Sequence, residues 1–208
     1  TTLSNGVVNN AAYGSPTDGQ ADLPPGATEV ELSDETIFDF SSSTISQTST
    51  DVTVGGNIVT LTQQVTLQSG VDGEPIVVTN SNLDNVSVSI PDGTTIQGPA
   101  GWEGTIEPPK TASSSGAAPS GFSVGSTVIS VGSPDGILVF SHSVTILLEG
   151  VTGSVGYRPA GSDTWVEITN VCGGDYTDPE DPVSPGECSI SNGADTKIVT
   201  FHFTTFGS

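Results

Sequence analysis

The chain has 208 residues, with 24 Asp or Glu against three Lys or Arg, which gives a formal net charge of -21 at pH 7. A chain with so few basic residues lacks the face that would neutralise phosphates, which argues against nucleic acid and an anionic membrane surface as partners. Gly, Ser, Thr, Val and Pro dominate and no capped amphipathic helical segment stands out, so we predict an all-β protein that is long enough to bury a core.

The first 28 residues contain few large apolar side chains and several Pro, Gly and Asn residues. They are predicted to form an arm outside the globular part. Within this arm, Leu3, Val7 and Val8 could form one short strand that adds to a sheet edge of a neighbouring copy as a donor strand. That interpretation predicts a homopolymer, whereas the alternative is a disordered leader with no role in assembly.

Residues 29–208 are predicted to form one antiparallel β-sandwich domain. Short apolar runs alternate with turn residues, a spacing typical of a sandwich rather than of a parallel sheet. Gly55-Gly56-Asn57 predicts a hairpin turn between two of these runs. The candidate strands in the first half of the domain span residues 28–32, 37–40, 52–54, 58–67, 75–79 and 83–90.

Trp102 lies between glycines and is expected to fill the core or cap a strand, with a carbohydrate platform as the alternative. Residues 111–121, rich in Ser, Ala and Gly, are interpreted as a long loop inside the same sandwich rather than a linker between domains. The strands predicted after this loop span residues 122–131, 137–140, 144–148, 154–158 and 164–168.

The last strand, residues 197–206, carries the strongest strand pattern in the chain. Its apolar side chains are expected to face the core and its polar ones the outer face. The polar set includes His202, and a His-Phe-Thr sequence could support self-cleavage. The imidazole of His202 would take the proton of the Thr204 hydroxyl, whose oxygen would attack the carbonyl of Phe203 to form an ester that water opens. The apolar set is Val199, Phe201 and Phe203, and the polar set is Thr200, His202 and Thr204.

The two cysteines, Cys172 and Cys188, flank a loop rich in Pro and acidic residues. We predict that they form a disulfide in an oxidising compartment, with free thiols in a reducing cytosol as the alternative. Two lone thiols are too few for a metal site. The sequence has no Met, so the chain is expected to be a processed product or an excised segment. Together these features predict an extracellular or cell-surface location.

Carboxylates gather between the two cysteines, and hard oxygen ligands of this kind suit Ca²⁺. The loop lacks the spacing of an EF-hand, so the alternative is a solvated acidic loop without a cation. No other cofactor is expected. The candidate calcium ligands are Asp175, Asp178, Glu180 and Asp181, with Glu187 as the fifth carboxylate of the loop.

Three single residues carry weaker signals. Asn85 begins an Asn-Val-Ser sequon, which would be a glycosylation site in a source that glycosylates. His142 is expected to be a surface or hydrogen-bonded histidine, since two histidines do not supply a hydrolase triad. Lys197 could form an isopeptide crosslink to an asparagine that the sequence does not identify.

Several short segments, read together, carry a family resemblance. Residues 88–94, Val-Ser-Ile-Pro-Asp-Gly-Thr, resemble the Ile-Pro-x-Gly strand and turn of the ZU-five domains of ankyrins and netrin receptors. Residues 140–148 resemble their hydrophobic middle strand, and residues 165–168 their late Trp strand. Residues 202–206, His-Phe-Thr-Thr-Phe, are similar to their terminal His-Phe-Ser-x-Phe, with Thr in place of Ser.

The related GAIN domains of adhesion receptors end in a comparable Trp, Cys, Cys and His-Leu-Thr-x-Phe series. This resemblance covers roughly residues 50–208 and implies a sandwich whose last strand cuts itself between Phe203 and Thr204, with the two pieces held together by the sheet. The chain departs from the GAIN pattern in the wide spacing of its cysteines. Many members of these families keep the fold without cutting.

Two functions from different classes follow. The first is a non-enzymatic extracellular structural protein, a surface or filament subunit that assembles through strand addition by its arm. The alternative is an autoproteolytic interaction module of a larger surface receptor or adhesin.

Overall fold

The computed structural model describes residues 28–32, 38–39, 46–66, 73, 75–133 and 136–208. The predicted donor segment, Leu3, Val7 and Val8, lies outside these residues. The described part is all-β, as predicted: it consists of strands, turns and loops and contains no helix. Accordingly, it offers no helix long and apolar enough to span a membrane.

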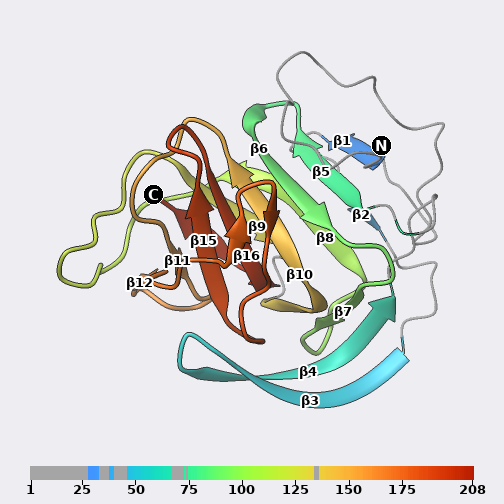
Figure 1. The fold of residues 1–208 in the computed structure, drawn as a ribbon. Coiled ribbons are helices and arrows are strands. Elements are labelled where there is room, and N and C mark those ends of the chain that lie inside the picture. Colours follow the sequence, from blue (N-terminus) through green and yellow to red (C-terminus); the bar gives the residue numbers. More distant parts are fainter. Residues whose placement is uncertain (1–27, 33–37, 40–45, 67–72, 74, 134–135) are drawn as a thin grey trace.

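The larger of two packed sheets contains nine strands (Figure 1). Its main path runs β1-β5-β6-β10-β7-β4-β3, while β16 pairs with β10 and β15 pairs with β16. All of its pairs are antiparallel except β1 with β5, which are parallel. The strands are β1 (Thr28–Leu32), β3 (Ser46–Val54), β4 (Asn57–Thr66), β5 (Ile76–Asn80), β6 (Leu83–Ile90), β7 (Thr95–Gly98), β10 (Leu138–Leu148), β15 (Glu187–Ser191) and β16 (Thr196–Phe203).

The second sheet has six strands in the order β12-β11-β17-β9-β8-β2, all antiparallel. A separate two-stranded hairpin, β13–β14, lies in the loop between the cysteines. The strands are β2 (Phe38–Asp39), β8 (Thr105–Thr111), β9 (Val128–Gly132), β11 (Gly156–Arg158), β12 (Val166–Glu167), β17 (Thr205–Gly207), β13 (Gly174–Asp175) and β14 (Asp178–Pro179).

One hydrophobic core fills the space between the sheets and includes residues from Val54 to Phe206. Trp102 is 1% exposed, and its Nε1 donates to the carbonyl of Thr105 at 2.7 Å. The ring packs on Gly98, where a Cβ would meet ring atoms at 2.5 Å. The core interpretation of Trp102 is therefore confirmed, and its ring is not presented at the surface as a carbohydrate platform.

The hairpin predicted at Gly55-Gly56 is confirmed. These two residues form the turn between β3 and β4 with φ of 57° and 82°, the left-handed values that a two-residue type I′ hairpin requires. Gly55 packs against Pro159 and Tyr157, near β11 of the other sheet, and a Cβ there would lie 2.5 Å from the Pro159 ring. The turn therefore closes one end of the core.

Several predicted boundaries are wrong. The two strands expected at residues 137–140 and 144–148 form one strand, β10, whose pairing with β16 shifts register between Val139 and Val144. The strand expected at residues 122–131 begins only at Val128; Phe122 lies before it in a loop and packs with Val128 and Trp165 in a small separate cluster. Four elements had no predicted counterpart: β7, β8, β15 and the β13–β14 hairpin.

The last strand is the largest departure from the sequence pattern. All eight residues of β16 are buried, because β10 and β15 flank the strand and other parts of the protein cover both of its faces. The predicted half-buried strand with a polar outer face is therefore wrong. After Phe203 the chain bends at Thr204 and continues as β17 in the six-stranded sheet, so it crosses from one sheet to the other at this point.

Candidate functional site

The expected alternation along β16 breaks at Thr200. Its Oγ1 lies 3.3 Å from the amide N of His202, which donates to it, and 3.4 Å from the carbonyl of the same residue. On either side of this irregularity, Ile198 and Phe203 both lie in the main core, although an even alternation would place them on opposite faces. Val199 instead packs against the disulfide. The expectation that Val199, Phe201 and Phe203 share one core face is therefore wrong.

His202 is inside the molecule, contrary to the prediction that it lies on an outer face. It is 1% exposed and packs against two aromatic rings, with centroids 4.9 Å away for Tyr157 and 6.0 Å for Phe206, the latter stacked. Its Nε2 is 3.4 Å from Oε2 of Glu187, whose side chain is 16% exposed. Its Nδ1 is buried and has no hydrogen-bond partner among the described residues.

Glu187 also faces the phenol of Tyr157, which is 3% exposed. Burial, and then the charge of Glu187 and its hydrogen bond to the phenol, raise the pKa of Tyr157 well above its usual value, against a smaller opposing effect of a backbone hydrogen bond from Gly55. Glu187 therefore joins the phenol and the imidazole at the boundary between the two sheets. We call Tyr157, Glu187 and His202 the buried polar cluster.

Thr204, the predicted nucleophile, is 8% exposed, and its hydroxyl donates to the carbonyl of Arg158 at 2.6 Å. The hydroxyl is therefore directed toward β11 rather than held by the imidazole of His202, which faces Glu187. In this arrangement base and nucleophile are two residues apart in sequence but are not joined by a hydrogen bond.

A small cavity borders the predicted cleavage point. It has a volume of about 100 Å³ and is lined by Phe203, Thr204 and Thr205 together with residues of β9 and the loop after it. Gly132, at φ 122°, comes so close that a Cβ there would lie 2.8 Å from the Cβ of Phe203. The cavity is large enough to hold water beside the Phe203–Thr204 peptide.

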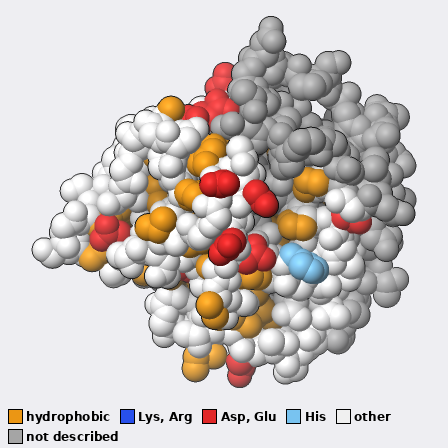
Figure 2. Space-filling model, viewed as in Figure 1, with side chains coloured by type: hydrophobic (Ala, Val, Ile, Leu, Met, Phe, Trp, Pro, Cys, Tyr) orange, Lys and Arg blue, Asp and Glu red, His pale blue; other side chains and the backbone are white. Residues whose placement is uncertain are grey.

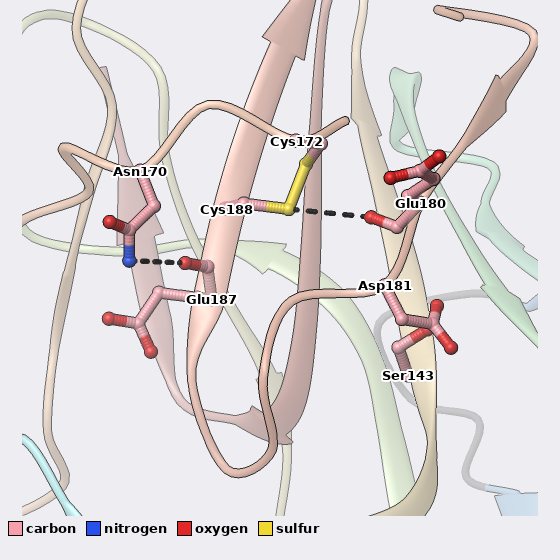
Figure 3. The surroundings of a disulfide bond; sticks show 7 residues. All are labelled: Ser143, Asn170, Cys172, Glu180, Asp181, Glu187 and Cys188. Atoms are coloured by element: carbon pink, nitrogen blue, oxygen red, sulfur yellow. Dashed lines mark hydrogen bonds between the residues drawn. A yellow bond between two sulfur atoms is a disulfide. The ribbon is translucent and has the colours of Figure 1, made fainter. Parts of the chain in front are cut away.

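The predicted disulfide between Cys172 and Cys188 is confirmed (Figure 3). Both cysteines are buried and pack with Val199 and Ile190. Next to the bond, Asn170 Nδ2 donates to the carbonyl of Glu187 at 3.3 Å. The carbonyl of Glu180 lies 3.8 Å from the Cys188 sulfur, a contact rather than a hydrogen bond because a disulfide sulfur carries no proton. The disulfide thus joins the start of the loop to β15 and packs against Val199 of β16.

The acidic side chains of this loop point in different directions. Figure 3 shows Glu187 on one side of the disulfide and both Glu180 and Asp181 on the other. Asp181 accepts a hydrogen bond from Ser143 of β10 at 2.5 Å. Asp175 and Asp178 pair across the β13–β14 hairpin. Within the described ranges no three His, Cys, Asp or Glu residues are grouped to hold a metal ion, so the fold does not assemble the predicted calcium ligands.

The other single-residue candidates are separate from these regions. Lys197 is 8% exposed; its Nζ donates to the carbonyl of Tyr176 at 3.0 Å and lies 4.5 Å from the centre of that ring. The predicted surface position of His142 is confirmed: it is exposed, with Nδ1 3.2 Å from the Ser141 hydroxyl. Asn85 is partly exposed in β6, and its carbonyl accepts from the amide of Glu149.

Sequence reasoning did not single out Tyr157 as a partner of His202. It lies in a short strand without a catalytic motif, and only the fold brings its ring centroid to within 4.9 Å of that of the imidazole. Glu187 was counted only as a loop carboxylate, because β15, which positions it against β16, had no strand prediction.

Comparison with known proteins leaves the function to be argued from these contacts. No known protein family matches the chain, and no curated protein matches it significantly.

Proposed function

We propose that the chain is an extracellular structural protein, a surface or filament subunit that assembles by adding the N-terminal arm of one copy to a sheet edge of the next. The disulfide supports the proposed extracellular location, because such bonds persist in oxidising surroundings. The high acidic charge would keep the assembled surface solvated. The observation that carries the assembly proposal is an open edge at β3.

Among the described residues, β3 ends the larger sheet and pairs on one side only, with β4. Figure 1 shows it as the outer strand of a long hairpin. Its register is irregular between Gln47 and Thr50 but regular from Thr50 to Val54. A regular run of this length can accept a short strand such as the one predicted around Leu3 to Val8, since an unpaired edge presents free N–H and C=O groups.

The turn geometry identifies which groups the edge offers. In a two-residue hairpin the residues flanking the turn, Val54 and Asn57, form a hydrogen-bonded pair, so the next residue on β3, Thr53, directs its N–H away from β4. Thr53→Pro removes that N–H without removing a bond to β4. Thr53→Val keeps it and is the matched control.

The experiment measures assembly by analytical ultracentrifugation and electron microscopy. We expect the wild type and Thr53→Val to form polymers and Thr53→Pro to remain monomeric while keeping a cooperative unfolding transition. Polymers of unchanged length from Thr53→Pro would contradict the β3 edge as acceptor. A wild type that stays monomeric at all concentrations would contradict the proposed function itself.

The second candidate is the autoproteolytic module, and the location of the Phe203–Thr204 peptide favours it. This peptide lies where the chain bends between two sheets, beside a cavity of about 100 Å³. Cleavage would need the Thr204 hydroxyl to leave the Arg158 carbonyl and give its proton to a base. Its oxygen would then bond to the Phe203 carbonyl carbon as the peptide C–N bond breaks and the Thr204 nitrogen takes up the proton, which gives an ester and a free amine. Water would hydrolyse the ester to the Phe203 carboxylate and the Thr204 hydroxyl.

Mass spectrometry of the denatured protein tests this candidate. Cleavage predicts two fragments that divide after Phe203, absent in Thr204→Val and retained in the control Thr205→Val. A single full-length mass in the wild type would exclude the autoproteolytic module.

A further inference from the structure

A second cavity lies on the outer face of the nine-stranded sheet, away from the buried polar cluster. Its volume is about 260 Å³. The β13–β14 hairpin of the cysteine loop forms one wall, through Thr177, Asp178 and Pro179. Figure 2 shows acidic side chains gathered on the face that Figure 1 presents with β15 and β16 in front.

The floor of the cavity is formed by two neighbouring rows of side chains that cross the sheet in register. One row runs from β5 to β16, with Val77 opposite Ser89, Ser89 opposite Thr145, and Thr145 opposite Val199. In the next row, Leu147 lies between Ser87 and Lys197. The first row thus has two neighbouring hydroxyl side chains between two apolar ones. The two rows form a patch that spans four strands, about 14 Å at the usual strand spacing. The residues of the two rows that line the cavity are Val77, Ser89, Thr145, Val199, Ser87, Leu147 and Lys197.

The hydroxyls of this floor are available to a ligand. Those of Ser87, Ser89 and Thr145 make no side-chain hydrogen bond within the described structure, and none is sealed from solvent. At the wall, Asp181 is held by Ser143 at 2.5 Å, and the loop that carries it is fastened by the disulfide. The Asp181 carboxylate is thus positioned before a ligand arrives, which lowers the entropic cost of binding.

The side chains that line the cavity restrict the class of ligand that it can bind. Two carboxylates, Asp178 and Asp181, outnumber the one ammonium, Lys197, which is already engaged by Tyr176. An anion is therefore disfavoured in a chain of net charge -21. Hydroxyls that donate and accept, carboxylates that accept, and an apolar floor match a molecule with several hydroxyls and C–H faces. The volume is below the about 300–1,000 Å³ of pockets for larger ligands.

We propose that this cavity binds one uncharged sugar residue, held by hydrogen bonds to Ser89, Thr145, Asp178 and Asp181 with its C–H face on Leu147, the most exposed apolar side chain of the floor. This binding does not depend on whether the chain polymerises or cleaves itself.

Ligand-observed NMR and calorimetry with the full chain test the proposal, using D-glucose, D-galactose, D-mannose and N-acetyl-D-glucosamine. Ethanolamine and acetate serve as cationic and anionic probes. We expect saturable binding of at least one sugar. In Ser89→Ala/Thr145→Val the affinity should fall about tenfold or more, because two hydrogen bonds are lost.

Two controls separate the site from general effects. Thr145→Ser keeps the hydroxyl and should bind within about threefold of the wild type, a change smaller than the loss of one hydrogen bond. Ser49→Ala/Thr53→Val removes exposed hydroxyls from β3, outside the cavity, and should bind as the wild type does. The proposal is overturned if none of the four sugars binds saturably, if the cavity double variant binds as tightly as the wild type, or if only a charged probe binds.

Discussion

The three side chains of the buried polar cluster lie together at the edge of the core. Glu187 contacts both the imidazole of His202 and the phenol of Tyr157. A buried polar group is costly unless it is paired, so each member of the cluster depends on Glu187 remaining in position. The unpartnered Nδ1 of His202 shows that the pairing is incomplete.

Tyr157 gives this cluster a measurable pH dependence. An unfolded tyrosine ionises near pH 10, whereas burial and Glu187 raise the pKa of Tyr157 in the fold. Above pH 10 the unfolded chain therefore loses a proton that the folded chain keeps, so the free energy of unfolding falls as pH rises. One such group accounts for about 1 kcal/mol between pH 10 and 11.

Urea unfolding of Tyr157→Phe across this range is the check. The variant should be less stable than the wild type at pH 7 by about 1 kcal/mol, through the lost hydrogen bond to Glu187. Between pH 10 and 11, its free energy of unfolding should fall by about 1 kcal/mol less than that of the wild type. Tyr176→Phe, which keeps an aromatic ring beside Lys197, is the control and should retain the wild-type slope. Parallel slopes for all three proteins would refute the role assigned to Tyr157.

Among the secondary-structure elements, strands could be predicted from the sequence where a single apolar or turn pattern was sufficient to identify them. The β3–β4 hairpin follows from two glycines between apolar runs, β5 from a short continuous run of Ile and Val, and β6 from the alternation of Val and Ile with Ser. The pattern failed for β16, since a strand covered on both faces no longer needs to alternate. The pattern also missed β15. In the sequence, Glu187–Ser191 resemble the polar loop before them; in the structure, the disulfide and the pairing with β16 hold them in the sheet.

The same limits apply to the candidate sites. The disulfide could be predicted because two cysteines allow one pairing. The orientation of the Thr204 hydroxyl could not, because its acceptor is the main-chain carbonyl of Arg158, 46 residues away in sequence. The cavity on the outer face was equally hidden, since its floor depends on the register of four strands.

The β3–β4 turn allows a matched test of its packing. Gly55 and Gly56 both have positive φ, so replacing either by Ala costs about 1–2 kcal/mol of backbone strain. Only Gly55 has a close neighbour, the Pro159 ring, whereas a Cβ at Gly56 would meet nothing within 4 Å. Gly55→Ala should therefore lower the free energy of unfolding by about a further 1–3 kcal/mol, measured by urea denaturation. Equal losses in the two variants would mean that the turn does not pack on Pro159.

The disulfide-fastened loop should contribute a large share of the stability. The bond joins residues 16 apart, and closing a loop of this size stabilises a fold by about 3 kcal/mol. Cys172→Ala/Cys188→Ala is expected to unfold at lower urea concentration, with a loss of about 2–4 kcal/mol. If the double variant is within about 0.5 kcal/mol of the wild type, the loop is held by its other contacts and not by the disulfide.

At the scale of the whole molecule, one core joins the two sheets, and the chain ends by crossing between them at Thr204. The last strand of the larger sheet is buried along its whole length, while the β3 edge remains unpaired within the described residues. This combination suits a building block whose assembly uses backbone hydrogen bonds at the edge rather than a large apolar surface.

Electron microscopy of the full chain beside a variant that begins at residue 28 tests this account most directly. Because the arm is proposed to supply the added strand, we predict regular polymers from the full chain and dispersed single particles from the shortened one, with both unfolding cooperatively. Polymers of the same form from the shortened chain, or dispersed particles from the full chain, would contradict assembly by strand addition.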